Sequence, residues 1–305
     1  MSLRVAICIT TYHRRVELER TLAQIAALSP QPEEILLVAD GCSDGTAEFV
    51  RERHPGVRLI VHEQSCGSIP SRNEMATATS CDIFLSLDDD SYPLERDAIG
   101  RIRELFEMNP RLAVAEFPQR TDERADSLTA TDFGPARFIG SFANSGAAVR
   151  RAVFAKLGGY PDFFVHAYEE PDFALRCVSA GWQVRFEPGI TIRHHFTNLQ
   201  RNEIRTHHRH ARNEIWSAFL RCPMPQLLAV VPFRAWRQFG YAWKRGVAWV
   251  VREPAWWLQC LAGLGRCLKE RRPLPWARYR AWMELIRHPI AIENAAGWNA
   301  KFGEA

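Results

Sequence analysis

Four largely apolar residues, Phe84, Leu85, Ser86 and Leu87, run directly into three consecutive carboxylates, Asp88–Asp90. A strand covered on both faces of a sheet is apolar throughout, so this run predicts a buried strand. The acids follow at its carboxyl end, which is the edge where open α/β sheets bind ligands. Adjacent carboxylates repel one another and favour a counter-charge such as a divalent cation. A solvated acidic loop is the alternative, and residues elsewhere in the chain decide between the two.

The charge of the chain is divided unevenly. Its net charge of +4 combines −7 over residues 1–200 with +11 over residues 201–305. This asymmetry predicts an acidic part suited to a metal and a basic part suited to a polyanion or a membrane surface. No signal peptide and no apolar stretch of ~18 residues is visible, and the eight cysteines are scattered without a C-x-x-C pair. We therefore expect a cytoplasmic protein with reduced thiols, mostly in its core.

Short apolar runs alternate with helical patterns in the first half of the chain. Strands are expected at residues 4–9, 35–38, 57–61, 84–87 and 112–115, with helices between them. The alternation predicts an α/β fold with a mostly parallel central sheet and helices on both faces. Residues 118–135 are polar and without a period, so we expect a mobile loop over the active edge.

Polar side chains follow the first strands and suit a nucleotide. Those after the first strand are Thr10, Thr11, Tyr12 and Arg14. Asp40 follows the second strand, in a glycine-rich stretch that an ordinary strand–turn–helix corner explains equally well. Arg72 opens a short helix, where it is either a surface cation or a phosphate ligand.

A second acidic group lies in the second half of the chain. Glu169, Glu170 and Asp172 open a helix, where acids are also favoured by the helix dipole alone. Farther on, His194 and His195 end a short strand expected at residues 190–192. This histidine pair fits a structural or exposed role as well as a ligand role.

Taken in order, these pieces resemble glycosyltransferase family 2 of the bacterial type, over about residues 3–215. The matching motifs are Thr11–Arg14, Asp40–Thr46, Arg72–Asn73, Asp88–Asp90, Gly158–Tyr160, Glu169–Arg176, Pro188 with His194, and Arg212–Asn213. Two positions depart from the family pattern. Ala39 stands where the family has an acid, and Glu170 stands where it has the shorter aspartate that acts as general base.

The resemblance implies the GT-A fold and a role for each candidate residue. Glu170 aligns with the general base, and Glu169 and Asp172 stay open as other candidates because the reach of Glu170 differs. The implied metal ligands are Asp90, Asp88 and His194, for Mn²⁺ or Mg²⁺. The implied donor-binding residues are Thr10, Thr11, Tyr12, Arg14, Asp40, Arg72, Asp88 and Asp89.

The implied activity is inverting transfer of a sugar from a nucleotide-diphosphate donor, a UDP- or dTDP-sugar, to a hydroxyl. The acceptor is expected to be a saccharide or a lipid-linked molecule in cell-surface polysaccharide or glycolipid synthesis. Neither G-x-G-x-x-G nor a P-loop occurs, which argues against dinucleotide-binding oxidoreductases and P-loop NTPases. A nucleotidyltransferase that makes the sugar nucleotide is an alternative, although no glycine lies between Thr10 and Arg14. A non-catalytic polyanion- or membrane-binding protein is another.

The resemblance fades after residue 215, so we expect a catalytic domain over 1–215 and a basic, Trp-rich helical extension over 216–305. Eight of the ten tryptophans lie between 236 and 298. Trp236, Phe239, Trp243, Val247 and Val250 have helical spacing and are accompanied by Arg234, Arg237, Lys244, Arg245 and Arg252. Such a pattern suits an anionic membrane surface, here through residues 230–272, on the cytoplasmic face of the inner membrane. Packing on the catalytic domain is the alternative, and no nucleic acid partner is expected.

Overall fold

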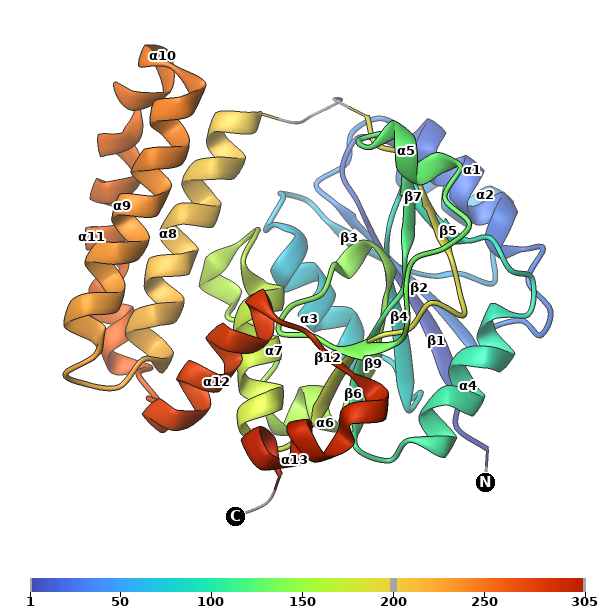
Figure 1. The fold of residues 1–305 in the computed structure, drawn as a ribbon. Helices are drawn as coiled ribbons and strands as arrows, with labels where there is room; N and C mark the ends of the chain where they lie inside the picture. The colour runs from blue at the N-terminus through green and yellow to red at the C-terminus, as the bar shows by residue number, and fades with distance from the viewer. Residues whose placement is uncertain (1, 198–201, 304–305) are drawn as a thin grey trace.

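The computed structural model describes residues 2–197 and 202–303. Figure 1 shows a sheet with helices on both faces and, beside it, a bundle of long helices. The strands are β1 Val5–Thr11, β2 Glu34–Asp40, β3 Arg58–His62, β4 Ile83–Asp88, β5 Ser91–Pro93, β6 Leu112–Glu116, β7 Gln119–Thr121, β8 Arg137–Phe138, β9 Ala147–Arg150, β10 Gln183–Phe186, β11 Ile192–His194 and β12 Ile290–Ala291. The helices are α1 Arg15–Ile25, α2 Thr46–Arg53, α3 Ser68–Ala78, α4 Ala98–Met108, α5 Ala125–Leu128, α6 Arg151–Lys156, α7 Glu169–Ser179, α8 Glu203–Arg221, α9 Leu227–Arg245, α10 Val247–Val250, α11 Glu253–Lys269, α12 Trp276–Arg287 and α13 Ala295–Phe302, with 3₁₀ turns η1 Asn144–Gly146, η2 Asp162–Phe164 and η3 Ile292–Asn294.

The central sheet has the order β12-β8-β10-β6-β9-β4-β1-β2-β3 within the described residues. Strands β4, β1, β2 and β3 are parallel neighbours, as the alternation predicted. β9 lies antiparallel between β4 and β6, and β8 and β12 add further antiparallel pairs. β9 is antiparallel because it starts from η1, at the carboxyl edge of β4, and runs back through the sheet. The sheet is therefore parallel on the β1 side and mixed beyond β4.

The strand predicted from the apolar run before the acids is confirmed as β4, which lies between β1 and β9 in the middle of the sheet. Alternate residues of each strand enter two different cores. In β1, Val5 and Ile7 face one core and Ala6 and Cys8 face the other. Helix α1 covers one face with an apolar stripe that includes Leu18, Leu22 and Ile25. Because both faces are covered, a continuous apolar run is what the position requires.

The segment over residues 118–135 is not the unstructured loop that its composition suggested. It contains β7 and α5, and β7 pairs in parallel with β11. Together with β5, these strands make a second, three-stranded sheet in the order β5-β11-β7. The strand expected at residues 190–192 is observed two residues later, as β11. It pairs with β5, the strand that directly follows Asp88–Asp90. The polar sequence fits this edge location, where pairing rather than a deep core defines the strands.

The helical part is joined closely to the catalytic part. The boundary expected at residue 215 falls inside α8, and α9 and α11 pack against α8. The chain then returns through α12, which packs on α7, and β12 completes the edge of the central sheet beside β8. In the described part of the chain, no helix is both long and apolar enough to span a membrane.

The α8–α11 contact depends on one glycine. A Cβ built at Gly263 would lie 2.2 Å from the Trp216 ring, whose Nε1 donates to the Cys260 carbonyl at 2.9 Å. Nothing lies within 4 Å of a Cβ at Gly265, on the same helix. The two glycines therefore lie two residues apart on the same helix, and only Gly263 packs against a side chain of α8.

We expect Gly263→Ala to lower the free energy of unfolding by about 1–3 kcal/mol, because the added methyl group displaces a buried indole. The matched variant Gly265→Ala has room and gains up to about 1 kcal/mol from helix propensity. Urea denaturation of both variants beside the unmodified protein measures the difference. Equal stabilities for the two variants would contradict the close α8–α11 contact.

Candidate active site

Three parallel strands end side by side at one edge of the sheet. The register places Thr10 of β1 opposite Asp88 of β4, and Thr11 opposite Ala39 of β2. The carboxyl ends of parallel strands meet at the same edge, where α/β sheets bind ligands. The residues predicted to bind the donor after β1, β2 and β4 are therefore brought to one place.

Asp88, Asp90 and His194 form a compact cluster at this edge, with ligand atoms all within 4.8 Å of one another. The antiparallel pairing of β5 with β11 brings them together, since it places His194 opposite Ser91, the residue after the acids. His194 Nε2 lies 3.3 Å from Asp90 Oδ1, and its Nδ1 lies 3.1 Å from Gln119 Oε1. These are the three residues implied as metal ligands by the resemblance. Gln119 was missed because it lies in the segment expected to be a loop.

The cluster fits a divalent cation. Mg²⁺ prefers carboxylate oxygens, and a set that also contains an imidazole suits Mn²⁺. Burial raises the pKa of Asp90, but His194 and Arg14 beside it outweigh burial and hold that pKa below its ordinary value. Asp90 is therefore an anion at neutral pH, as a metal ligand must be. A cation held by these residues supplies the positive charge that a departing diphosphate needs.

Asp89 points away from the cluster, into the protein. Its carboxylate pairs with Arg14 at 3.0 Å, and Arg14 also pairs with Asp90. Its carbonyl accepts a hydrogen bond from Thr21 Oγ1 at 2.8 Å. Desolvation raises the pKa of Asp89 to about 8, because burial outweighs the attraction of Arg14. Of these two predicted donor-binding acids, Asp88 has the accessible side chain, at 27% exposure against 4% for Asp89. The donor-binding role predicted for Asp89 therefore disagrees with its burial beside Arg14.

Arg72 joins the acid triplet to the second acidic group. One of its terminal nitrogens lies 2.6 Å from Asp88 Oδ1 and the other lies 3.2 Å from Glu169 Oε1. Asn144 Nδ2 donates to the same Glu169 oxygen at 3.2 Å, and Tyr160 Oη donates to Asn144 Oδ1 at 2.8 Å. Arg72 is thus a buried bridge rather than a surface cation. Asn144 was missed as a site residue, since the Asn144–Gly146 segment before β9 reads as an ordinary polar turn.

Glu170 has an environment distinct from that of Glu169. Burial and the neighbouring Glu169 raise the pKa of Glu170 well above its ordinary value, against the opposing effect of Arg72. Its Oε1 lies 3.5 Å from the Asn144 backbone nitrogen. A raised pKa gives a carboxylate more affinity for a proton, which is the property a general base needs.

A strained turn presents these two acids. Val165, Ala167 and Tyr168 have positive φ angles of 65°, 73° and 68°, which non-glycine residues adopt at a cost. Asn213 stabilises the turn from α8, because its Nδ2 lies 2.9 Å from the His166 carbonyl and 2.7 Å from the Ala167 carbonyl. The Arg212–Asn213 motif therefore positions the start of α7.

Asp172 has different hydrogen-bond partners from those of Glu169 and Glu170. Its carboxylate accepts from Arg176 at 2.9 Å, from Arg221 at 3.1 Å and from Ser217 at 2.9 Å. Burial raises its pKa, but the two arginines outweigh burial and lower it. These contacts tie α7 to α8. They favour a structural role over the catalytic role that the sequence left open.

Asp40 organises a loop rather than presenting a free carboxylate. It accepts hydrogen bonds from Ser65 Oγ at 2.7 Å and from the backbone nitrogens of Cys66 and Gly67 at 2.9 Å each. Burial raises its pKa, but these bonds and that of His62 lower it to about 2. Gly41 permits the close approach, since a Cβ there would lie 2.5 Å from the Ser65 nitrogen. This geometry therefore does not favour the donor-binding role predicted for Asp40.

Of the predicted donor residues on the first strand and its turn, Tyr12 is the exposed one, at 42%. Thr10 and Thr11 are buried, and Arg14 is committed to Asp89 and Asp90. The Tyr12 ring therefore offers a surface on which a nucleobase can stack.

Residues 6–180 match the model of the family described as "Glycosyl transferase family 2". The match spans more than half of the chain. The protein belongs to glycosyltransferase family 2. It is therefore a glycosyltransferase of bacterial type, and not the nucleotidyltransferase or the non-catalytic polyanion-binding protein that its composition left open.

Two similar proteins are rhamnosyltransferases. An N-acetylglucosaminyl-diphospho-decaprenol L-rhamnosyltransferase of Mycobacterium tuberculosis is 25% identical over 230 residues, covering 61% of this chain and 74% of the relative. An O-antigen chain rhamnosyltransferase, WbaN, of Salmonella anatum is 24% identical over 191 residues, covering 57% of this chain and 60% of the relative.

Solved structures agree with the GT-A fold. A Pyrobaculum calidifontis mannosyltransferase in complex with GDP-Man and Mn²⁺ superposes with a TM-score of 0.57 at 18% identity, covering 94% of this chain and 85% of that one. S. aureus TarS 1-349 in complex with UDP-GlcNAc superposes with a TM-score of 0.61 at 13% identity, covering 87% and 82%.

The acid cluster predicts a selective loss of metal binding. In the presence of UDP, we expect Mn²⁺ to raise the melting temperature of the protein and Asp90→Asn to remove most of that shift, because one anionic ligand is lost. Asp89→Asn is the matched control: it makes the same change one residue away, in a side chain turned from the cluster. An undiminished Mn²⁺ shift in Asp90→Asn would contradict the assignment of the cluster as the metal site.

Proposed function

We propose that this glycosyltransferase transfers a sugar, with inversion, from a UDP- or dTDP-sugar to a hydroxyl of a lipid-linked saccharide in cell-surface polysaccharide or glycolipid synthesis. The observation that carries the proposal is the Arg72 bridge. It connects Asp88 of the metal cluster with Glu169, the neighbour of the predicted base, so the donor and acceptor halves share one rigid ion-pair network. Single displacement needs the leaving group and the base held on opposite sides of one carbon.

In this mechanism the chain's residues divide the work. Asp88, Asp90 and His194 would hold a divalent cation, and the imidazole would favour Mn²⁺ over Mg²⁺. Tyr12 stacks on the base, which orients the donor at the sheet edge. Glu170 takes the proton from the attacking hydroxyl, and Asn144 and Arg72 keep its neighbour Glu169 in place. Transfer to a lipid-linked saccharide is supported by the diphospho-decaprenol acceptor named in the mycobacterial relative.

We predict that Glu170→Gln lowers sugar transfer by at least about 10²–10⁴-fold, the usual worth of general-base help. UDP affinity in the presence of Mn²⁺ should stay within about twofold, because Glu170 belongs to the acceptor half. Initial rates with the donor that best stabilises the protein, together with calorimetric UDP titrations, give both readouts.

Two comparisons sharpen this test. In the unmodified enzyme, kcat should fall as pH falls through the raised pKa of Glu170, since the base must be ionised; the acid limb should therefore lie above the ordinary value of 4.5. Glu169→Gln should instead disturb UDP affinity, because it breaks the Arg72 bridge. Near-normal turnover in Glu170→Gln would move the base to Glu169.

We also propose that the outer face of the helical part contacts an anionic membrane. Trp236 and Trp243 of α9 are 71% and 68% exposed, and Leu258 and Leu261 of α11 are 67% and 64% exposed. Figure 1 shows these two helices on the side of the molecule away from the sheet. The exposed cations on the same helices are Arg237, Lys244, Arg245, Arg266 and Lys269. Such a surface suits the interface of anionic lipids, where each basic residue contributes about 1 kcal/mol.

One cation expected on that face is in the core instead. Arg234 is buried and donates to Tyr168 Oη at 3.0 Å and to the Glu214 carbonyl at 3.1 Å. The helix turns this position toward α8, so Arg234 holds the bundle together and does not face lipid.

We expect the protein to float with phosphatidylglycerol vesicles at low salt, and Trp236→Ser/Trp243→Ser to reduce the bound fraction at least about tenfold, because two large apolar side chains no longer enter the interface. Val16→Ser/Met108→Ser removes two equally exposed apolar side chains from α1 and α4 and should bind as the parent does. Absence of flotation by the unmodified protein would contradict membrane contact while leaving the sugar-transfer proposal intact.

A further inference from the structure

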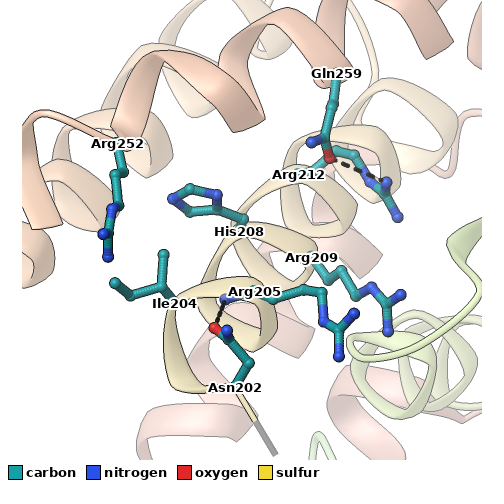
Figure 2. Close-up of a pocket in the computed structure, with 8 residues that line it drawn as sticks. All are labelled: Asn202, Ile204, Arg205, His208, Arg209, Arg212, Arg252 and Gln259. Atoms are coloured by element: carbon teal, nitrogen blue, oxygen red, sulfur yellow. Dashed lines mark hydrogen bonds between the residues drawn. The ribbon is translucent and has the colours of Figure 1, made fainter.

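A basic cleft of about 510 Å³ lies between α8 and the start of α11. Arg205, Arg209 and Arg212 line it from α8, at spacings of four and three residues that place them on one face of the helix. Arg252, at the turn into α11, lines it from the opposite side. Figure 2 shows the three α8 side chains extending in the same direction, with His208 on the side toward Arg252.

In the described part of the chain, these guanidiniums have no acidic partners. Among residues 2–197 and 202–303, none of the four forms an ion pair with a carboxylate, whereas Arg221, Arg234 and Arg245 nearby each have one. Burial and the charge of Arg205 both lower the pKa of Arg209, and burial and Arg209 lower that of Arg212. The cations therefore repel one another in a partly desolvated cleft, an arrangement that an anion relieves.

The cleft adjoins the acceptor half of the active site. Arg212 donates to the Phe164 carbonyl at 3.0 Å, at the start of the strained turn that leads to Glu169 and Glu170. The charge of Arg209 acts on His166 in the same turn. The diphosphate of the donor is served separately, by the cluster of Asp88, Asp90 and His194.

We propose that this arginine cleft is a second diphosphate site, which holds the diphosphate that links the acceptor saccharide to its lipid carrier. The assignment rests on the proposed function, since it names the chemistry of the same acceptor. Guanidiniums bind phosphate oxygens in bidentate fashion, and several of them match the two to three negative charges of a diphosphate. α8 also packs against α9 and α11, whose outer faces carry the exposed apolar side chains that suit a lipid chain.

The test measures binding without any donor, so that it does not depend on sugar transfer. Farnesyl diphosphate is the probe, with farnesol and farnesyl monophosphate as comparisons, in calorimetric titrations of the full chain. Farnesyl diphosphate should bind more tightly than both. Arg205→Gln/Arg209→Gln should weaken its binding about 100-fold, as expected for the loss of two charged hydrogen-bonding groups. The affinity of Arg209→Lys for farnesyl diphosphate should lie between those of the parent and the double variant, because lysine keeps the charge and loses the bidentate geometry.

The matched control is Arg280→Gln/Arg287→Gln, which removes two exposed arginines from α12, outside the cleft. It should bind farnesyl diphosphate as the parent does. Thermal melting of each variant confirms folding, and Arg205 and Arg209 make no side-chain hydrogen bond or ion pair within the described residues that their loss would break.

Two other phosphate-bearing ligands fit the same arginines, and separate arms of the experiment distinguish them. If Arg205→Gln/Arg209→Gln weakens UDP–Mn²⁺ binding and leaves farnesyl diphosphate binding unchanged, the cleft serves the donor and the proposal is overturned. If this variant no longer binds phosphatidylglycerol vesicles, while the protein binds farnesyl diphosphate and farnesol equally well, the cleft holds phospholipid headgroups. That result also overturns the proposal. If the unmodified protein binds farnesyl diphosphate through these arginines but transfers no sugar, the result counts against the proposed function and not against the diphosphate site.

Discussion

The buried guanidinium of Arg72 is the interaction on which the active site depends. It lies between Asp88 and Glu169, two carboxylates that are 81 positions apart in the chain and that face each other across the site. Removing one partner from such a buried pair typically costs about 3–5 kcal/mol, because a charge is left without compensation. Arg72 sits on α3, which begins at the loop that Asp40 organises, so the geometry of the loop and of the bridge are linked. The two acidic groups of the candidate site are consequently positioned by one connected set of charges.

α8 connects that set to the helical part. One face carries Asn213, Ser217 and Arg221, which hold the strained turn and Asp172 of α7. Nearer its N-terminus, α8 carries Arg205, Arg209 and Arg212, which line the basic cleft. α8 therefore contacts the turn before α7 and α7 itself on one side, and packs against α9 and α11. This explains why the boundary expected at residue 215 does not separate two independent units.

The elements and residues that could be predicted from the sequence are those with a strong local pattern. The apolar run of β4 requires cover on both faces, and the alternation of strands and helices implies parallel strands whose carboxyl ends meet. The order of the motifs identified the family and named Asp88, Asp90 and His194 together. Segments without a local pattern were not predictable. β7 has a polar sequence and forms a strand by pairing with β11. Gln119 and Asn144 lie in the site because the fold places them beside His194 and Glu169.

The sequence by itself determined that acids follow a buried strand, that a second acidic group opens a later helix, and that the C-terminal part is basic and rich in tryptophan. Only the tertiary structure decided which acids do what. Asp88 and Asp89 are neighbours, yet Asp88 pairs with Arg72 at the site and Asp89 pairs with Arg14. Glu170 and Asp172 share a helix, yet Asp172 forms ion pairs with Arg176 and Arg221. The physical reason is that the charge state of a carboxylate is set by its burial and by cations brought from distant segments. The sequence shows the acids, whereas the fold supplies their partners.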